Sequence, residues 1–230
     1  MCLGGAGSFL PAALLCGTTV ALAASISPVL VELTPKAKVK SIRFTNTGSD
    51  IQIIQADVLE WRQENGRDVR ESTDRLMVTP RIARIPHGAT QVFRVSERTG
   101  AGSVERSYRL LLEDITSNAD RKAMPGNEIR LLFTADLPVF SAPVGTAKAI
   151  PVWSRCYVPV GKPCLRLDNQ GSKRVRISNV RLFDGRTETP LKIVDTVLAG
   201  SWKQWTVDSQ GAEQVRYSSE DGGANADLAR

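Results

Sequence analysis

Residues 78–95 read VTPRIARIPHGATQVFRV, two apolar runs on either side of a turn. The runs, 75–85 and 90–96, are rich in Val, Ile and Phe, and Gly88 in the sequence Pro86-His87-Gly88 can adopt the positive φ of a tight turn. Short apolar runs broken by Gly, Pro, Asn or Asp recur along the chain, and no segment keeps a helical period for three turns. The sequence therefore predicts an all-β protein.

Extending this pattern in both directions predicts a first domain over residues 25–142. Turn signals such as Asn46-Thr47-Gly48 and Asn65-Gly66 separate the runs. Seven expected strands indicate an immunoglobulin-like sandwich. They cover residues 28–33, 38–45, 51–61, 75–85, 90–96, 107–115 and 127–140.

A second, smaller β-sandwich is expected over residues 148–230. The stretch 141–148 is small and polar with Pro and Gly, as in a short interdomain linker. The tail, 218–230, is rich in Gly, Ala and Asp and is expected to be flexible. The expected strands lie at 149–156, 163–168, 174–183, 191–197, 203–207 and 214–217.

The first 24 residues carry no charged side chain and contain the apolar run FLPAALL at 9–15. This pattern predicts an export signal peptide over residues 1–24. A lipoprotein signal around Cys16 is the alternative, although Leu15 is large for that role.

In the exported protein, Cys156 and Cys164 remain and flank an expected turn. An oxidised pair suits an exported protein and would add about 2–3 kcal/mol of stability in the chain-entropy model. Metal binding is the weaker alternative, because no histidine or second cysteine pair accompanies them. We expect a disulfide, and no metal or other cofactor.

The charge pattern and the motifs argue against several functions. The net charge is +6, but Lys and Arg are interspersed with Asp and Glu, so no nucleic-acid partner is expected, nor is membrane insertion. The single histidine, His87, lies in a turn without a neighbouring nucleophile. No phosphate-binding glycine loop or nucleophile elbow occurs in the mature chain. An enzyme is therefore not expected.

Five segments, taken in order, carry a resemblance to a known family. They are 78–95, Tyr108-Arg109-Leu110-Leu111-Leu112-Glu113, Leu137-Pro138-Val139-Phe140, Leu167-Asp168-Asn169-Gln170-Gly171 and Val197-Leu198-Ala199-Gly200-Ser201. Together they resemble the periplasmic pilus-assembly chaperones of the chaperone–usher pathway, in the archaic branch associated with spore-coat-U-like pilins. The resemblance implies a periplasmic chaperone whose partners are pilin subunits and an outer-membrane usher.

In that family the last strand of the first domain fills a groove in the pilin, a form of strand addition. The resemblance implies that Ile129, Leu131, Phe133 and Ala135 are the pilin-binding side chains. Leu137 and Val139 continue the same alternation, so we expect the odd-numbered face to point outward to the pilin. The alternative is a structural or adhesive periplasmic protein in which this face covers its own core.

The family also binds the pilin's terminal carboxylate with basic side chains between its domains. Here Leu30 and Pro138 occupy the places of those residues, so the resemblance is incomplete. A buried carboxylate needs charge-assisted hydrogen bonds. The resemblance implies Arg109 as the replacement, because it lies in the strand expected to pair with the donor strand and matches the Tyr-Arg of this branch. A solvated strand arginine is the alternative interpretation of Arg109.

Overall fold

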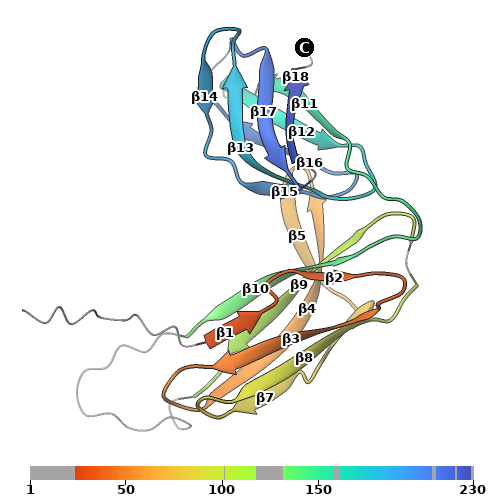
Figure 1. The fold of residues 1–230 in the computed structure, drawn as a ribbon, viewed down its shortest axis with the longest axis vertical. Helices are drawn as coiled ribbons and strands as arrows, with labels where there is room; N and C mark the ends of the chain where they lie inside the picture. The colour runs from red at the N-terminus through yellow and green to blue at the C-terminus, as the bar shows by residue number, and fades with distance from the viewer. Residues whose placement is uncertain are drawn as a thin grey trace, which may run out of the picture.

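The structure, a computed structural model, describes residues 24–100, 102–117, 132–157, 161–208, 211–220 and 222–228. Two β-sandwich domains follow one another along the chain, and they form the two lobes of Figure 1. This confirms the prediction of an all-β protein with two sandwiches. The expected signal peptide lies outside the described residues except for Ala24, the first residue of a strand.

The first domain packs two sheets face to face. Its strands are β1 (Ala24–Ser27), β2 (Val31–Leu33), β3 (Val39–Asn46), β4 (Gln52–Glu64), β5 (Arg67–Ser72), β6 (Leu76–Thr79), β7 (Ile82–Ile85), β8 (Thr90–Glu97), β9 (Arg106–Asp114) and β10 (Thr134–Ser141). One sheet has the order β1-β3-β8-β6, and the other has the order β2-β10-β9-β4-β5 with β7 paired to β4.

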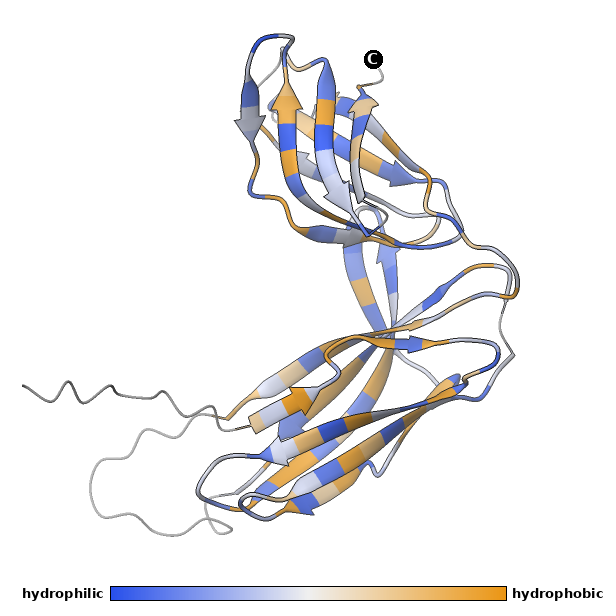
Figure 2. Cartoon of the chain, viewed as in Figure 1, coloured by the Kyte–Doolittle hydropathy of each residue, from blue (hydrophilic) through white to orange (hydrophobic). Residues whose placement is uncertain are grey.

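Alternating side chains build the core between these sheets. In β9, Tyr108, Leu110 and Leu112 are fully buried, whereas Arg109 and Leu111 between them are only partly buried. The same alternation appears as bands of opposite hydropathy along the strands in Figure 2. A period of two thus places one face of each strand in the core and leaves the other for contacts outside it.

The expected strand at 75–85 is two strands. It divides at Pro80 into β6, which pairs with β8, and β7, which pairs with β4 in the other sheet. The prediction of one continuous strand is wrong, because Pro80 has no N–H for a ladder and the chain changes sheets there. The turn after β7 is fixed by Asn46, whose amide donates to the Ile85 carbonyl at 2.9 Å.

The β4–β5 hairpin extends beyond the other strands of its sheet and reaches the second domain, as Figure 1 shows. Its tip is Asn65-Gly66, and both residues have positive φ, 52° and 75°. This pair of conformations is that of a two-residue hairpin turn, which explains the Asn-Gly sequence. The turn predicted there is therefore present, but the strand β5 that follows it was not foreseen.

The second domain is also a sandwich of two sheets, with the orders β11-β12-β16 and β14-β13-β17-β18, where β15 pairs with β13. Trp153, Ile177 and Val215 lie in its core. Its strands are β11 (Pro151–Tyr157), β12 (Pro163–Asn169), β13 (Val175–Phe183), β14 (Glu188–Pro190), β15 (Asp195–Val197), β16 (Trp202–Thr206), β17 (Gln214–Ser219) and β18 (Gly222–Asp227).

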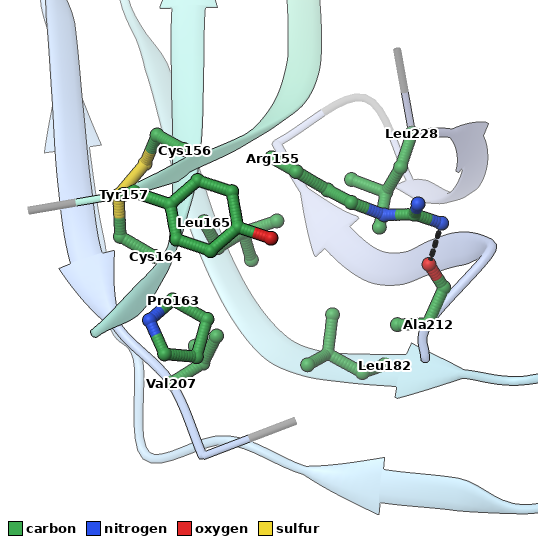
Figure 3. Close-up of a pocket in the computed structure, with 10 residues that line it drawn as sticks. All are labelled: Arg155, Cys156, Tyr157, Pro163, Cys164, Leu165, Leu182, Val207, Ala212 and Leu228. Atoms are coloured by element: carbon green, nitrogen blue, oxygen red, sulfur yellow. Dashed lines mark hydrogen bonds between the residues drawn. A yellow bond between two sulfur atoms is a disulfide. The ribbon is translucent and has the colours of Figure 1, made fainter. Parts of the chain in front are cut away.

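The predicted disulfide is present in this domain. Cys156 on β11 lies directly opposite Cys164 on β12, with the Cα atoms 4.8 Å apart, and the two are bonded. Figure 3 shows the bond beside Tyr157 and Leu165 at one end of the sandwich. The cavity there measures about 20 Å³, which is room for one water molecule.

The C-terminal tail differs from the flexible segment that we expected. β18 pairs with β17 over its whole length, from Gln214↔Asp227 to Ser219↔Gly222. Leu228 follows the strand and is 8% exposed in the second core. The composition argument failed because edge-strand pairing uses backbone groups, which Gly and Ala supply as well as larger residues do.

Residues 142–150, which include most of the expected linker, contain no helix or strand. Within the described ranges, no helix has the length and apolar character needed to cross a membrane.

Candidate functional site

Strand β10 has an incompletely paired edge. On one side it pairs with β9 from Thr134↔Glu113 to Ser141↔Arg106, but on the other side β2 pairs only with residues 139–141. Among the described residues, no strand pairs with that second edge over 134–138. The backbone there can therefore accept a strand from another protein.

The odd-numbered side chains of this strand face the first domain's core. Phe133 stacks on Phe44 with ring centroids 5.7 Å apart, and Ala135 also packs against the core. Leu137 and Val139 are 7% and 0% exposed, so the expectation that they point outward to a pilin is wrong. The alternation was correctly identified, but it continues the core face of the sheet.

The other candidate donor residues, Ile129 and Leu131, lie outside the described residues. Leu132, in the opposite phase to Phe133, is 62% exposed.

A cleft of about 350 Å³ lies between the two domains, next to this edge. Trp61, Arg109 and Phe140 line it from the first domain, and Arg174, Arg176 and Val194 line it from the second. Leu30 and Pro138, which the resemblance implies are at the places of the family's basic residues, line the same cleft. The structure thus places Arg109 in the cleft where a carboxylate anchor is expected.

Arg109 is fixed by its neighbours yet incompletely hydrogen-bonded. It lies opposite Pro138 in the sheet, and its guanidinium stacks over the Trp61 ring at 4.1 Å. Burial lowers the pKa of Arg109, while the nearby Asp136 raises it. The Nε atom of Arg109 is buried and has no hydrogen-bond acceptor among the described residues.

Arg174 has a different environment, because three carboxylates surround it. Its guanidinium pairs with Glu105 at 2.7 Å, Glu32 at 2.6 Å and Glu220 at 3.4 Å, and it stacks over Phe140 at 3.7 Å. The side chains of Arg174 and Glu105 are 3% and 4% exposed. Arg174 therefore holds the two domains together and is already neutralised.

Arg176 points into the same cleft from β13 but is exposed, and it makes no ion pair with any residue that the structure describes. A cationic group without a partner on the wall of a cleft can assist in binding an anion.

The tip of the β4–β5 hairpin joins the domains at a second point. The Gln63 side chain donates to the Thr196 carbonyl at 2.8 Å and accepts from the Leu198 amide at 2.9 Å. Lys203 pairs with Asp68 of the hairpin at 3.3 Å. Burial raises the pKa of Asp68, but the Gln63 amide and the Lys203 charge outweigh it, so the pKa is lowered overall.

The residues considered for catalysis are not assembled into a reactive site. His87 lies in an exposed turn, where its Nδ1 is hydrogen-bonded with the Gly48 carbonyl. Among the described residues, no group of three or more His, Cys, Asp or Glu side chains is arranged to hold a metal ion.

Sequence reasoning did not find Arg174, Arg176, Asp136 or Arg70. Arg70, Asp136 and Arg176 lie on β5, β10 and β13, and Arg174 immediately precedes β13. Their positions in the sequence do not indicate that they meet a neighbouring domain or strand. Only the fold shows which surface charges face one cleft.

An open strand edge beside an arginine-lined cleft, in a chain of two β-sandwich domains, is suited to binding a partner by strand addition. Residues 23–147, more than half of the chain, match the family described as "Pili and flagellar-assembly chaperone, PapD N-terminal domain". The chain therefore belongs to the pilus-assembly chaperone family, as its motifs predicted, and this is a family of chaperones, not enzymes.

Solved structures agree with the fold. A chain of the CsuC–CsuE chaperone–tip adhesion subunit complex, from archaic chaperone-usher Csu pili of Acinetobacter baumannii, is 19% identical, with a TM-score of 0.73 over 89% of this chain and 97% of that one. The Pseudomonas aeruginosa CupB2 chaperone is 17% identical, with a TM-score of 0.62 over 89% and 100%. No curated protein sequence gives a significant match.

A third similar structure is a complex of the Salmonella enterica SafA pilin with the SafB chaperone. A chain of it is 13% identical to this protein, with a TM-score of 0.64 over 90% of this chain and 95% of that one.

Proposed function

We propose that this protein is a periplasmic chaperone that caps a pilin subunit by lending it the strand around residues 129–135 and then delivers it to an outer-membrane usher. The observation that carries the proposal is the open edge of β10 over residues 134–138. A subunit strand added there would form backbone hydrogen bonds that the chaperone's own β2 leaves unmade.

The inward direction of Phe133 and Ala135 is compatible with this role. A subunit strand added to the open edge would extend the same sheet, so the odd-numbered side chains would face a core shared by the two proteins. Ile129 and Leu131 would lie farthest into the subunit, with Phe133 and Ala135 at the junction. Each large side chain buried in this way contributes about 1.5–3 kcal/mol before association entropy is subtracted.

Arg109 would bind the subunit's terminal carboxylate. It lies in the cleft, opposite Pro138 of β10, and its Nε lacks an acceptor. A carboxylate can meet a guanidinium through two parallel hydrogen bonds, which gives both strength and orientation. The exposed Arg176 on the opposite wall would add charge without direct contact being required.

The comparisons support the partner class and the archaic branch. The structure with the TM-score of 0.73 comes from archaic chaperone-usher pili and includes a tip adhesion subunit. Another similar structure is a chaperone bound to a pilin, with a TM-score of 0.64. The usher is inferred from the pathway to which this family belongs.

One observation favours the alternative, a structural or adhesive periplasmic protein. Phe133 already stacks on Phe44 inside the first domain, so the apolar face of this edge strand is partly covered by the protein's own core. A Phe133→Asp variant would therefore disturb the fold under either reading. The discriminating substitutions must be made elsewhere on the strand.

Leu131 and Leu132 provide a matched pair of positions, since adjacent strand residues face opposite sides. Tagged protein would be co-expressed with a candidate pilin subunit from the same genome and purified from the periplasm. We expect Leu131→Asp to abolish co-purification while Leu132→Asp retains it, with both variants folded by circular dichroism. Absence of the pilin from the folded wild type would contradict the chaperone function.

A further inference from the structure

Asp136 lies between two arginines, one of which, Arg109, lines the cleft. Its Oδ2 is 2.7 Å from Nη2 of Arg70 on β5, and its Oδ1 is 3.6 Å from Nη1 of Arg109 on β9. The first distance is that of a charge-assisted hydrogen bond, whereas the second is too long for one. Arg70 therefore holds Asp136, and Arg109 is only loosely engaged.

Both sides of the loose contact have unused hydrogen-bonding capacity. Asp136 Oδ1 and Arg109 Nε are buried, and neither has a hydrogen-bond partner among the described residues. Buried polar atoms in native proteins nearly always have partners, so one such atom on each of the two residues indicates that the ion pair between them is incomplete. The Arg109 guanidinium can therefore still bind a carboxylate that is better placed than Asp136.

We propose that Asp136 is an internal stand-in for the subunit's terminal carboxylate. In the free chaperone it partly neutralises Arg109, and when the subunit binds, the subunit's carboxylate replaces it on Arg109. This inference rests on the proposed function, because it assumes that Arg109 is the anchor. It adds a residue of the chaperone itself that competes with the subunit.

Arg70 makes the exchange feasible. Two carboxylates near one guanidinium repel each other, so an arriving carboxylate would be opposed by Asp136. Because Asp136 is also bound to Arg70 at 2.7 Å, its charge stays paired when Arg109 turns to the subunit. The β4–β5 hairpin thus both bridges the domains and holds the competing carboxylate.

The position of Asp136 links the competition to the donor strand. It is the residue after Ala135, on the opposite face of the same strand, so its place depends on how that strand is seated. A competing carboxylate on this strand lowers the affinity for the subunit and speeds its release. A chaperone that must later release its subunit benefits from this lower affinity.

The test is the rate at which the subunit leaves the complex. Chaperone–pilin complexes made with wild type or Asp136→Asn would be mixed with an excess of differently tagged wild-type chaperone, and transfer of the pilin would be followed over time. We expect Asp136→Asn to slow the transfer roughly 1.5- to fivefold, the range for one partly exposed ion pair.

Glu188→Gln is the matched control. Glu188 also lies between two arginines, Arg181 and Arg216, and is 33% exposed against 31% for Asp136, but it belongs to β14 of the second domain. The control should leave the transfer rate unchanged. In an Arg109→Ala background, Asp136→Asn should also have no effect, because its action requires Arg109.

The outcomes separate the two claims. Transfer by Asp136→Asn at the wild-type rate or faster, or an equal effect with and without Arg109, overturns the stand-in role while leaving the chaperone function intact. Failure of wild type to capture the pilin at all overturns both. Thermal unfolding of each variant identifies any change that comes from the fold itself.

Discussion

Replacing Arg174 by methionine should separate the contribution of the buried interdomain ion pair from the rest of the interface. The variant leaves Glu105, 4% exposed, without its main countercharge. Removing one member of a buried pair costs about 3–5 kcal/mol, because the remaining charge is neither solvated nor paired. This is a large part of the roughly 5–15 kcal/mol that stabilises a typical domain.

The assay is urea denaturation followed by tryptophan fluorescence. With an m-value of roughly 2 kcal/mol/M, the expected loss moves the midpoint down by about 2 M. The double variant Glu105→Gln/Arg174→Met should regain most of the stability, since no charge is then left buried. A loss below about 1 kcal/mol for Arg174→Met alone would refute the reasoning.

The same variant should be sensitive to pH. Burial raises the pKa of Glu105 even with Arg174 in place, and removing Arg174 raises it further. When the pKa of a carboxyl group is higher in the folded state than in the unfolded state, the group contributes most to stability below its unfolded-state pKa. That contribution is lost as the pH rises through the folded-state pKa. The loss of unfolding free energy caused by Arg174→Met should therefore be smaller near about pH 5 than near about pH 8.

Three further outcomes are expected. Gly66→Ala should destabilise the protein by about 1–3 kcal/mol in urea, because Gly66 has a φ of 75° and an added Cβ would lie 2.7 Å from the Trp202 ring; an unchanged midpoint would contradict the contact. Gln63→Ala should cost about 1–3 kcal/mol, because it removes the two hydrogen bonds of Gln63 across the domain interface together with its bond to Asp68. The range of interdomain angles measured by X-ray scattering should widen, whereas Gln55→Ala should leave that range unchanged. Reduction of Cys156–Cys164 should lower stability by about 2–3 kcal/mol without affecting the first domain, measured with and without dithiothreitol; equal melting in both conditions would contradict this.

The fold was largely predictable because its signals are local. Alternating apolar residues and turn residues such as Asn65-Gly66 specify strands and their ends within a few positions. The errors have equally local causes. Pro80 divides an apolar run that periodicity alone treats as one strand, and the tail 218–230 forms β18 through backbone pairing, which composition does not report.

The site was predictable only in part. Arg109 could be selected because a resemblance drew attention to the Tyr-Arg strand, and it does line the cleft. Arg70 and Asp136, by contrast, are 66 positions apart and meet only because β5 and β10 belong to one sheet. Which face of the donor strand meets the core likewise depends on the packing of Phe133 against Phe44.

The most direct test of the central claim is hydrogen–deuterium exchange at the open edge of β10. Amides over residues 132–137 that do not pair with β9 should exchange quickly in the free chaperone and become protected in its complex with the pilin. Amides of residues 139–141 that bond to β2 should be protected in both states and serve as the internal reference. Unchanged exchange at 132–137 in a verified complex would contradict strand addition at this edge.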